Sequence, residues 1–359
     1  MKVTKYLAAA VVSLGFVQGA YAQQTRMLSA DKSTDYGIAY SLPVTAIQVD
    51  VTATTTVRRP GPYRQYAGRY LGKADIISEA SQQSAVAGVR VSTYGVPGDS
   101  KYVMQLKPGA VASVCVDEDG MLLAINTEAE APAVSRTDVL PAGSEPDMDE
   151  YLKYVDADFL ASLSSAKRAE MLAQTIMEIR ESRLSLSRGT AETMPADGRQ
   201  LELMLQSLET QEKALTRAFT GYEYTATETR SYSVIPDTVQ PSRTILCRLG
   251  NHSGLTDADT PVGEPVYLDL SSVRRMEWPV NAKGEPKVLP KDAVRYALPA
   301  TAKVSVVWRG NTLYSHDLQF AQLGDVFGLD PKLFSDKRSP SMALFDPVTG
   351  ALTSIELVK

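Results

Sequence analysis

The stretch "AIQVDVTATTTVR", residues 46–58, decides how the rest of the chain is interpreted. Polar and apolar residues alternate through its first half, and Val, Ile and Thr dominate throughout, which is typical of a β-strand. The pattern is longer than most strands in globular proteins. We therefore expect one long strand to organise the N-terminal part of the chain.

Further strand patterns follow it. "AGVRVSTYGVPGDSKYVMQL", residues 87–106, contains two strand-like runs around a Pro-Gly-Asp turn. "VASVCVDEDGMLLAIN", residues 111–126, has the pattern of a hairpin, and its Asp119-Gly120 pair favours a type I′ turn. Together these patterns predict an N-terminal β-rich unit over residues 23–145, with a short Tyr-rich helix.

The hydrophobic period changes after a Pro-rich, acidic linker. Between residues 164 and 219 apolar residues recur at steps of three and four, which indicates helices. Gly189 is placed to end the first helix and Asp197 to cap the second, with Gln200 at capping-box spacing. We expect an antiparallel helical hairpin within residues 146–220.

Strand patterns separated by Pro and Gly return over residues 221–359 and predict a C-terminal β-rich unit. The expected fold class is therefore α+β, with two β-rich units flanking a long antiparallel helical hairpin.

The N-terminus resembles a secretory signal peptide. Lys2 and Lys5 precede an apolar run from Leu7 to Val17, and Ala20-Tyr21-Ala22 is a small-x-small cleavage motif. We expect cleavage after Ala22, which makes residues 1–22 a signal peptide. The protein is then exported to the periplasm, associated with the outer membrane or secreted, and no membrane-spanning segment is expected in the mature chain.

Composition limits the partners. The formal net charge is −5 at pH 7, so the chain lacks the overall positive field that non-specific nucleic-acid binding uses. The chain has two cysteines, Cys115 and Cys247, both in strand patterns. They could form a disulfide in an exported protein or stay as buried thiols, and the sequence leaves both open.

Catalytic motifs are incomplete. The chain has two histidines, His252 and His316, and "GNHSG" around His252 and Ser253 lacks the serine position of a nucleophile elbow. The acidic turns lack the spacing of a calcium loop. We therefore expect no catalytic residue, no metal site and no cofactor.

The candidate ligand-binding residues lie in "RRPGPYRQYAGRYLGKADII", residues 58–77. If Pro62 begins a helix, Tyr63, Tyr66 and Tyr70 form one stripe. Such a stripe favours packing against the N-terminal sheet. The alternative is a glycan or peptide platform in which Arg64 and Arg69 act with the rings.

One charged residue interrupts the apolar ladder of the first predicted helix. Arg183 falls where a further apolar residue is expected, and an unpaired buried charge is costly. The register of an antiparallel hairpin places Glu202 opposite it. We therefore predict an Arg183–Glu202 ion pair, with a solvated Arg183 as the alternative.

Four segments resemble a known family: "GPYRQYAGRYLG", "IMEIRESRLSLSRG", "MPADGRQLELMLQSLETQEKALTRAFTG" and "FAQLGDVFGL". They are similar to signature segments of domain of unknown function family 4831, a group of exported proteins of Bacteroidales-type bacteria. The similarity runs from about Val44 to the C-terminus. It implies export and the order β-unit, helical hairpin, β-unit, and it carries no catalytic residues.

The functional expectation follows from these observations. We expect an exported, non-enzymatic structural or binding protein of the cell envelope, whose partner is an envelope protein or a glycan. The alternatives are a glycan or peptide hydrolase that uses a carboxylate pair and a carbohydrate-binding module.

Overall fold

The computed structural model covers most of the chain that follows the predicted signal peptide. The described residues are 26–29, 38–104, 113–133, 138–236, 243–290, 293–334 and 340–357. The predicted signal peptide, residues 1–22, lies outside them.

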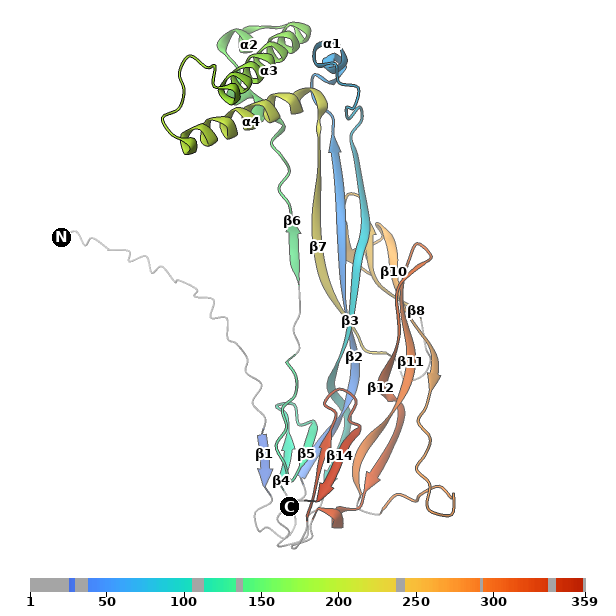
Figure 1. Cartoon of the computed structure of the whole chain (residues 1–359). Coiled ribbons are helices and arrows are strands. Elements are labelled where there is room, and N and C mark those ends of the chain that lie inside the picture. Colours follow the sequence, from blue (N-terminus) through green and yellow to red (C-terminus); the bar gives the residue numbers. More distant parts are fainter. Residues whose placement is uncertain are drawn as a thin grey trace, which may run out of the picture.

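One long strand, β2 (Ile38–Arg59), runs through most of the length of the molecule (Figure 1). At about 3.3 Å per residue it spans about 70 Å. It pairs antiparallel with β3 (Ser81–Met104) on one side and with β7 (Tyr222–Val234) on the other. The short strand β6 (Val139–Ala142) extends this sheet beyond β7. The stretch 46–58 thus lies within the long strand that its pattern predicts and forms its C-terminal part.

A second antiparallel sheet packs on one face of the first. Its order is β12-β11-β10-β8-β9, with β8 Arg243–Gly250, β9 Gly254–Asp257, β10 Glu264–Arg274, β11 Val294–Trp308 and β12 Asn311–Leu329. Alternate residues of β2, Ile47, Val49 and Val51, are fully buried in the core between the two sheets. The alternation of residues 46–58 therefore separates a core face from an outer face.

A third sheet closes the end of the molecule that lies away from the helices (Figure 1). Its order is β1-β4-β5-β13-β14, with β1 Arg26–Ser29, β4 Ser113–Val116, β5 Leu122–Ile125, β13 Ser341–Phe345 and β14 Leu352–Leu357. Tyr40 and Leu42, near the start of β2, pack into a second core with residues of β4, β5 and β11 to β13. One strand thus contributes to two cores.

The predicted fold class is wrong. The described part of the chain is mostly β, in three antiparallel sheets, and it does not divide into two β-rich units around a hairpin. Strands from before and after the helices share sheets, because β2 pairs with β7 and β5 pairs with β13. Periodicity identified the strands but carries no information on such distant pairing. The residue limits proposed for the segments stay a prediction.

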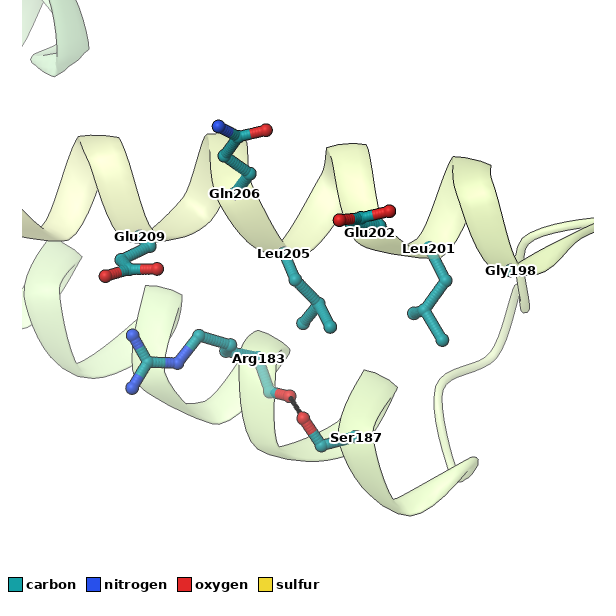
Figure 2. A pocket seen from close by; sticks show the side chains of 8 residues that line it. All are labelled: Arg183, Ser187, Gly198, Leu201, Glu202, Leu205, Gln206 and Glu209. Atoms are coloured by element: carbon teal, nitrogen blue, oxygen red, sulfur yellow. Dashed lines mark hydrogen bonds between the residues drawn. The ribbon is translucent and has the colours of Figure 1, made fainter.

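The predicted long helical hairpin is also wrong. Helices α3 (Ser165–Arg188) and α4 (Gly198–Thr220) contact each other over part of their lengths and diverge toward their connecting loop (Figure 2). The buried residues of α4 all lie in its C-terminal half, from Ala214 to Phe219. The remaining helices are η1 Arg64–Tyr66, α1 Ala67–Leu71, η2 Met148–Tyr154, α2 Ala157–Ala161 and η3 Pro331–Leu333.

The predicted helix ends at this loop are confirmed. Gly189 ends α3 in the left-handed conformation, with φ 71° and ψ 22°. The Asp197 carboxylate accepts a hydrogen bond from the backbone N–H of Gln200 at 2.7 Å. The Gln200 side chain in turn accepts one from the backbone N–H of Ala196 at 3.0 Å. The local capping residues thus predicted the helix ends correctly, although the predicted packing of the two helices is wrong.

The hairpin β4–β5 forms as expected, but its turn is not of type I′. That turn requires positive φ at two successive residues. Gly120 has φ 80°, whereas Asp119 is not among the residues with positive φ. The Asp117 carboxylate accepts hydrogen bonds from the backbone N–H groups of Asp119 and Met121, which fixes a longer loop.

The two cysteines are buried free thiols, Cys115 in β4 and Cys247 in β8. None of the helices in the described ranges is long and apolar enough to cross a membrane.

Candidate functional site: a helical head with an open cleft

The predicted ligand-binding and structural residues lie at one end of the molecule. Here η1, α1, η2, α2, α3 and α4 form a compact unit beyond the end of the long strands (Figure 1). We call residues 62–77 and 147–220 the helical head. It contains all the predicted ligand-binding and structural residues, although they are distant in sequence.

The first entry of the chain into the head and its last exit lie in close backbone contact. The backbone N–H of Tyr63 donates to the carbonyl of Ala218 at 2.9 Å, just beyond Gly61. Gly221, which follows α4, has φ 77° and ψ −168°, a conformation that essentially only glycine adopts. A Cβ at Gly221 would lie 2.2 Å from the carbonyl oxygen of Arg59. We call this crossing, residues 59–61 and 218–222, the neck.

Tyr63 belongs to the core of the head. Its side chain is buried, and its ring lies 6.1 Å from the rings of Tyr151 and Phe219 and 6.4 Å from that of Phe159. The edge-to-face geometry with Tyr151 is a favoured aromatic contact. The packing interpretation therefore fits Tyr63. Its predicted partner is wrong, however, because the ring packs against the helices and not against the N-terminal sheet.

The other residues of the predicted stripe are closer to solvent. Tyr66 and Tyr70 are half-buried at the edge of the same core, and the Tyr66 hydroxyl lies 3.1 Å from the Ser165 hydroxyl at the start of α3. The Arg69 guanidinium lies 5.3 Å from the centre of the Tyr70 ring, and Arg64 is exposed. The five candidate ligand residues therefore do not form one exposed platform.

A cleft opens where α3 and α4 diverge. It has a volume of about 730 Å³ and is open to solvent. In Figure 2 the side chains of Leu201 and Leu205 point from α4 into the space between the helices. Glu202, Gln206 and Glu209 add polar groups from the same helix. The cleft thus combines two leucines with a polar rim that contains Glu202, Glu209 and Arg183.

Arg183 is paired, but with a different residue from the predicted one. Its Nη1 donates to Oε2 of Glu212 at 2.6 Å, and Nε of Arg180 donates to Oε1 of the same carboxylate at 2.6 Å. Figure 2 shows the Arg183 guanidinium turned away from Glu202. The prediction of an Arg183–Glu202 pair is wrong because the helices diverge where it assumed contact. Glu212 was missed, and its only sequence signal is its spacing on α4.

The two histidines contact other side chains and are not among the residues that line the cleft. His252 Nδ1 lies 3.4 Å from Gln82 Oε1, and the His316 ring lies 4.9 Å from the Tyr314 ring. No group of three or more His, Cys, Asp or Glu that could hold a metal ion occurs in the described ranges.

One buried carboxylate lies on the outer face of the long sheet. Asp50 accepts hydrogen bonds from Ser231 at 2.6 Å, Arg90 at 2.7 Å and Gln48 at 3.1 Å. Burial alone would raise the pKa of Asp50, but these hydrogen bonds outweigh it and hold that pKa below its usual value. Asp50 therefore fits a structural ion pair that links three strands.

Comparison with known proteins gives one match. No curated protein and no solved structure matches the chain. The family model described as "Domain of unknown function (DUF4831)" matches residues 36–353, which include both long strands of the first sheet, the helical head and the second sheet. The match agrees with the resemblance found in the four sequence segments. This chain belongs to the DUF4831 family.

Proposed function

We propose that this chain is an exported, non-enzymatic binding protein of the cell envelope that seats an amphipathic helix of a partner protein in the cleft between α3 and α4. The observation that carries the proposal is the unfilled space between two helices, with Leu201 and Leu205 directed into it. The signal-peptide pattern of residues 1–22 supports export to the periplasm or the outer membrane.

The shape of the cleft favours a helix as its occupant. Helices pack with their axes about 8–10 Å apart, and two diverging helices leave a groove that a third can fill. A small molecule would stay largely exposed in so open a space, whereas small-molecule sites usually enclose most of their ligand. Binding of an amphipathic helix in an apolar groove is a common recognition mode.

The charges of the cleft indicate which charged side chain the partner helix would carry. Glu202 is exposed and has no ion pair in the part of the chain that the structure describes. Glu209 lies 2.7 Å from Lys213, whose hydrogen bond and charge lower the pKa of Glu209. A partner helix with an apolar stripe and a basic residue opposite Glu202 would complement this surface.

Further apolar side chains are exposed on the head. Examples are Leu160, Leu163, Met177, Leu184 and Met204. Exposed apolar residues mark an interaction site where they form a contiguous patch.

The two alternatives have less support. A carbohydrate-binding module would display its tyrosines, yet Tyr63 is buried in the head. A hydrolase would hold two carboxylates in a cleft, with the pKa of one of them raised. Burial raises the pKa of Asp117, but its carboxylate is engaged by backbone N–H groups in the β4–β5 turn. These observations favour binding over catalysis.

Affinity capture tests the proposal. The purified chain should retain a specific envelope protein, and Leu205→Asp should weaken its binding about tenfold to a hundredfold, because a buried leucine contributes about 1.5–3 kcal/mol. Glu202→Lys should also weaken binding. Leu203→Asp is the matched control, because Leu203 is an exposed leucine of the same helix outside the cleft lining. If Leu205→Asp binds the partner as tightly as Leu203→Asp does, the cleft is not the binding surface.

A further inference from the structure

A second hollow, of about 380 Å³, lies beside the cleft, where the end of α1 meets α3 and α4. Its lining is rich in cationic side chains that come from three separate segments. They are Lys73 after α1, Arg180 and Arg183 on α3, and Lys213 and Arg217 on α4. We call this hollow the basic pocket.

The basic pocket carries an excess of positive charge. Its lining contains the five cations and two carboxylates, Glu209 and Glu212. A third carboxylate, Glu150, pairs with Arg217 at 3.1 Å from outside the lining. Five positive and three negative charges leave an excess of two. This excess contrasts with the formal net charge of −5 of the whole chain.

The two arginines are held in place before any ligand arrives. The Glu212 carboxylate, whose side chain is only 15% exposed, accepts one hydrogen bond from each of Arg180 and Arg183. A guanidinium has five N–H donors, so most donors of both groups stay available. Both arginine side chains are 41% exposed, and both line the hollow. Their orientation is therefore fixed while their outer edges remain accessible.

The two lysines add ammonium groups around these fixed guanidinium groups. Lys73 follows Gly72, which ends α1 in the left-handed conformation, and it has no ion pair within the described ranges. Lys213 projects from α4 toward Glu209, at 2.7 Å. The Thr216 hydroxyl adds a neutral donor to the lining. Fixed guanidinium groups combined with ammonium groups are the chemistry that binds phosphate oxygens.

We propose that the basic pocket binds a phosphate group, as free phosphate or as the phosphate of a lipid headgroup. The excess of two positive charges matches a dianionic phosphate monoester, and the arginine edges can each donate two N–H groups to its oxygens. The site is separate from the seat of the partner helix, because Lys73 and Lys213 line the basic pocket and not the cleft. It shares Arg183 and Glu209 with the cleft, so that the two sites adjoin.

The experiment uses the purified mature chain in two arms at constant ionic strength. In the first, inorganic phosphate is titrated by calorimetry against a chloride blank. In the second, the chain is mixed with vesicles of phosphatidylcholine that contain phosphatidic acid and with vesicles of phosphatidylcholine alone. The test variant is Lys73→Gln with Lys213→Gln, which leaves the Arg180–Glu212–Arg183 bridge intact. The control is Lys283→Gln with Lys303→Gln, two exposed lysines far from the head in sequence.

We expect saturable binding that the test variant weakens at least tenfold and the control leaves unchanged. Binding in the first arm identifies free phosphate as a ligand, and binding only to the phosphatidic acid vesicles identifies the headgroup. The proposal is overturned by the absence of saturable binding in both arms, or by equal binding of the test and control variants. Capture of the partner by the cleft is measured separately on the Leu205→Asp variant, so failure of either proposal is recognised independently.

Discussion

Gly221→Ala is expected to lower the free energy of unfolding by about 3 kcal/mol or more, because backbone conformations reserved for glycine cost other residues about 1–3 kcal/mol before any clash is counted. The clash comes in addition. The new Cβ would lie 2.2 Å from the carbonyl oxygen of Arg59, a backbone atom in the paired strand β2 that cannot move aside without breaking the neck. Chemical denaturation of the purified chain measures this loss.

Gly189→Ala is the matched control for that variant. Gly189 also has positive φ, at 71°, but a Cβ there would meet no atom within 4 Å. Only the left-handed conformation opposes alanine at this site, at a cost of about 1–2 kcal/mol. Equal losses from the two substitutions would show that the neck contact between Gly221 and Arg59 does not constrain the fold.

Phe219→Ala is expected to destabilise the head by about 3–5 kcal/mol, which is typical of removing a fully buried phenylalanine. Phe219 has no exposed surface and contacts the Tyr63 ring, so its loss leaves a cavity at the centre of the aromatic core. The head should then become sensitive to proteolysis before the sheets unfold. Limited proteolysis followed by mass spectrometry locates the first cleavage sites.

Leu203→Ala provides the comparison, because Leu203 is 58% exposed on α4 and its truncation removes little packing. We expect it to change stability by less than about 0.5 kcal/mol. If Phe219→Ala were as stable and as protease-resistant as Leu203→Ala, the aromatic cluster would not hold the head together.

Local signals in the sequence were reliable where the physics is local. The alternation of residues 46–58 predicted the central strand, and Gly189 and Asp197 mark helix ends as their chemistry requires. The Asp119-Gly120 hairpin also forms, although its turn differs in type. In each of these cases the interaction joins residues that are close in sequence.

Contacts between distant segments could not be predicted from the pattern. β2 pairs with β7 across the whole helical head, and nothing in either strand's alternation specifies that partner. The resulting shared sheet is what makes the two-unit fold class wrong. Helix periodicity likewise indicated helices between residues 164 and 219 but not the angle between α3 and α4.

The candidate site shows the same limit at the level of single residues. Arg183 needs a partner, as predicted, and it pairs with Glu212. The predicted partner, Glu202, is wrong, because the predicted register assumed that the two helices touch along their whole length. Tyr63 was correctly assigned to packing, but its neighbours Tyr151 and Phe159 lie some 90 residues away in the chain. The cleft exists because α3 and α4 diverge, and only the three-dimensional structure shows this divergence.

Site-specific photo-crosslinking in intact cells tests whether the cleft between α3 and α4 binds a partner helix. A photoreactive phenylalanine replaces Leu205 inside the cleft or, as the control, Leu203 on the outer surface of the same helix. We expect one dominant adduct from position 205, with the crosslinked peptide on the apolar face of an amphipathic helix of another envelope protein, and little adduct from position 203. Equal yields from the two positions, or no adduct from position 205, would contradict it.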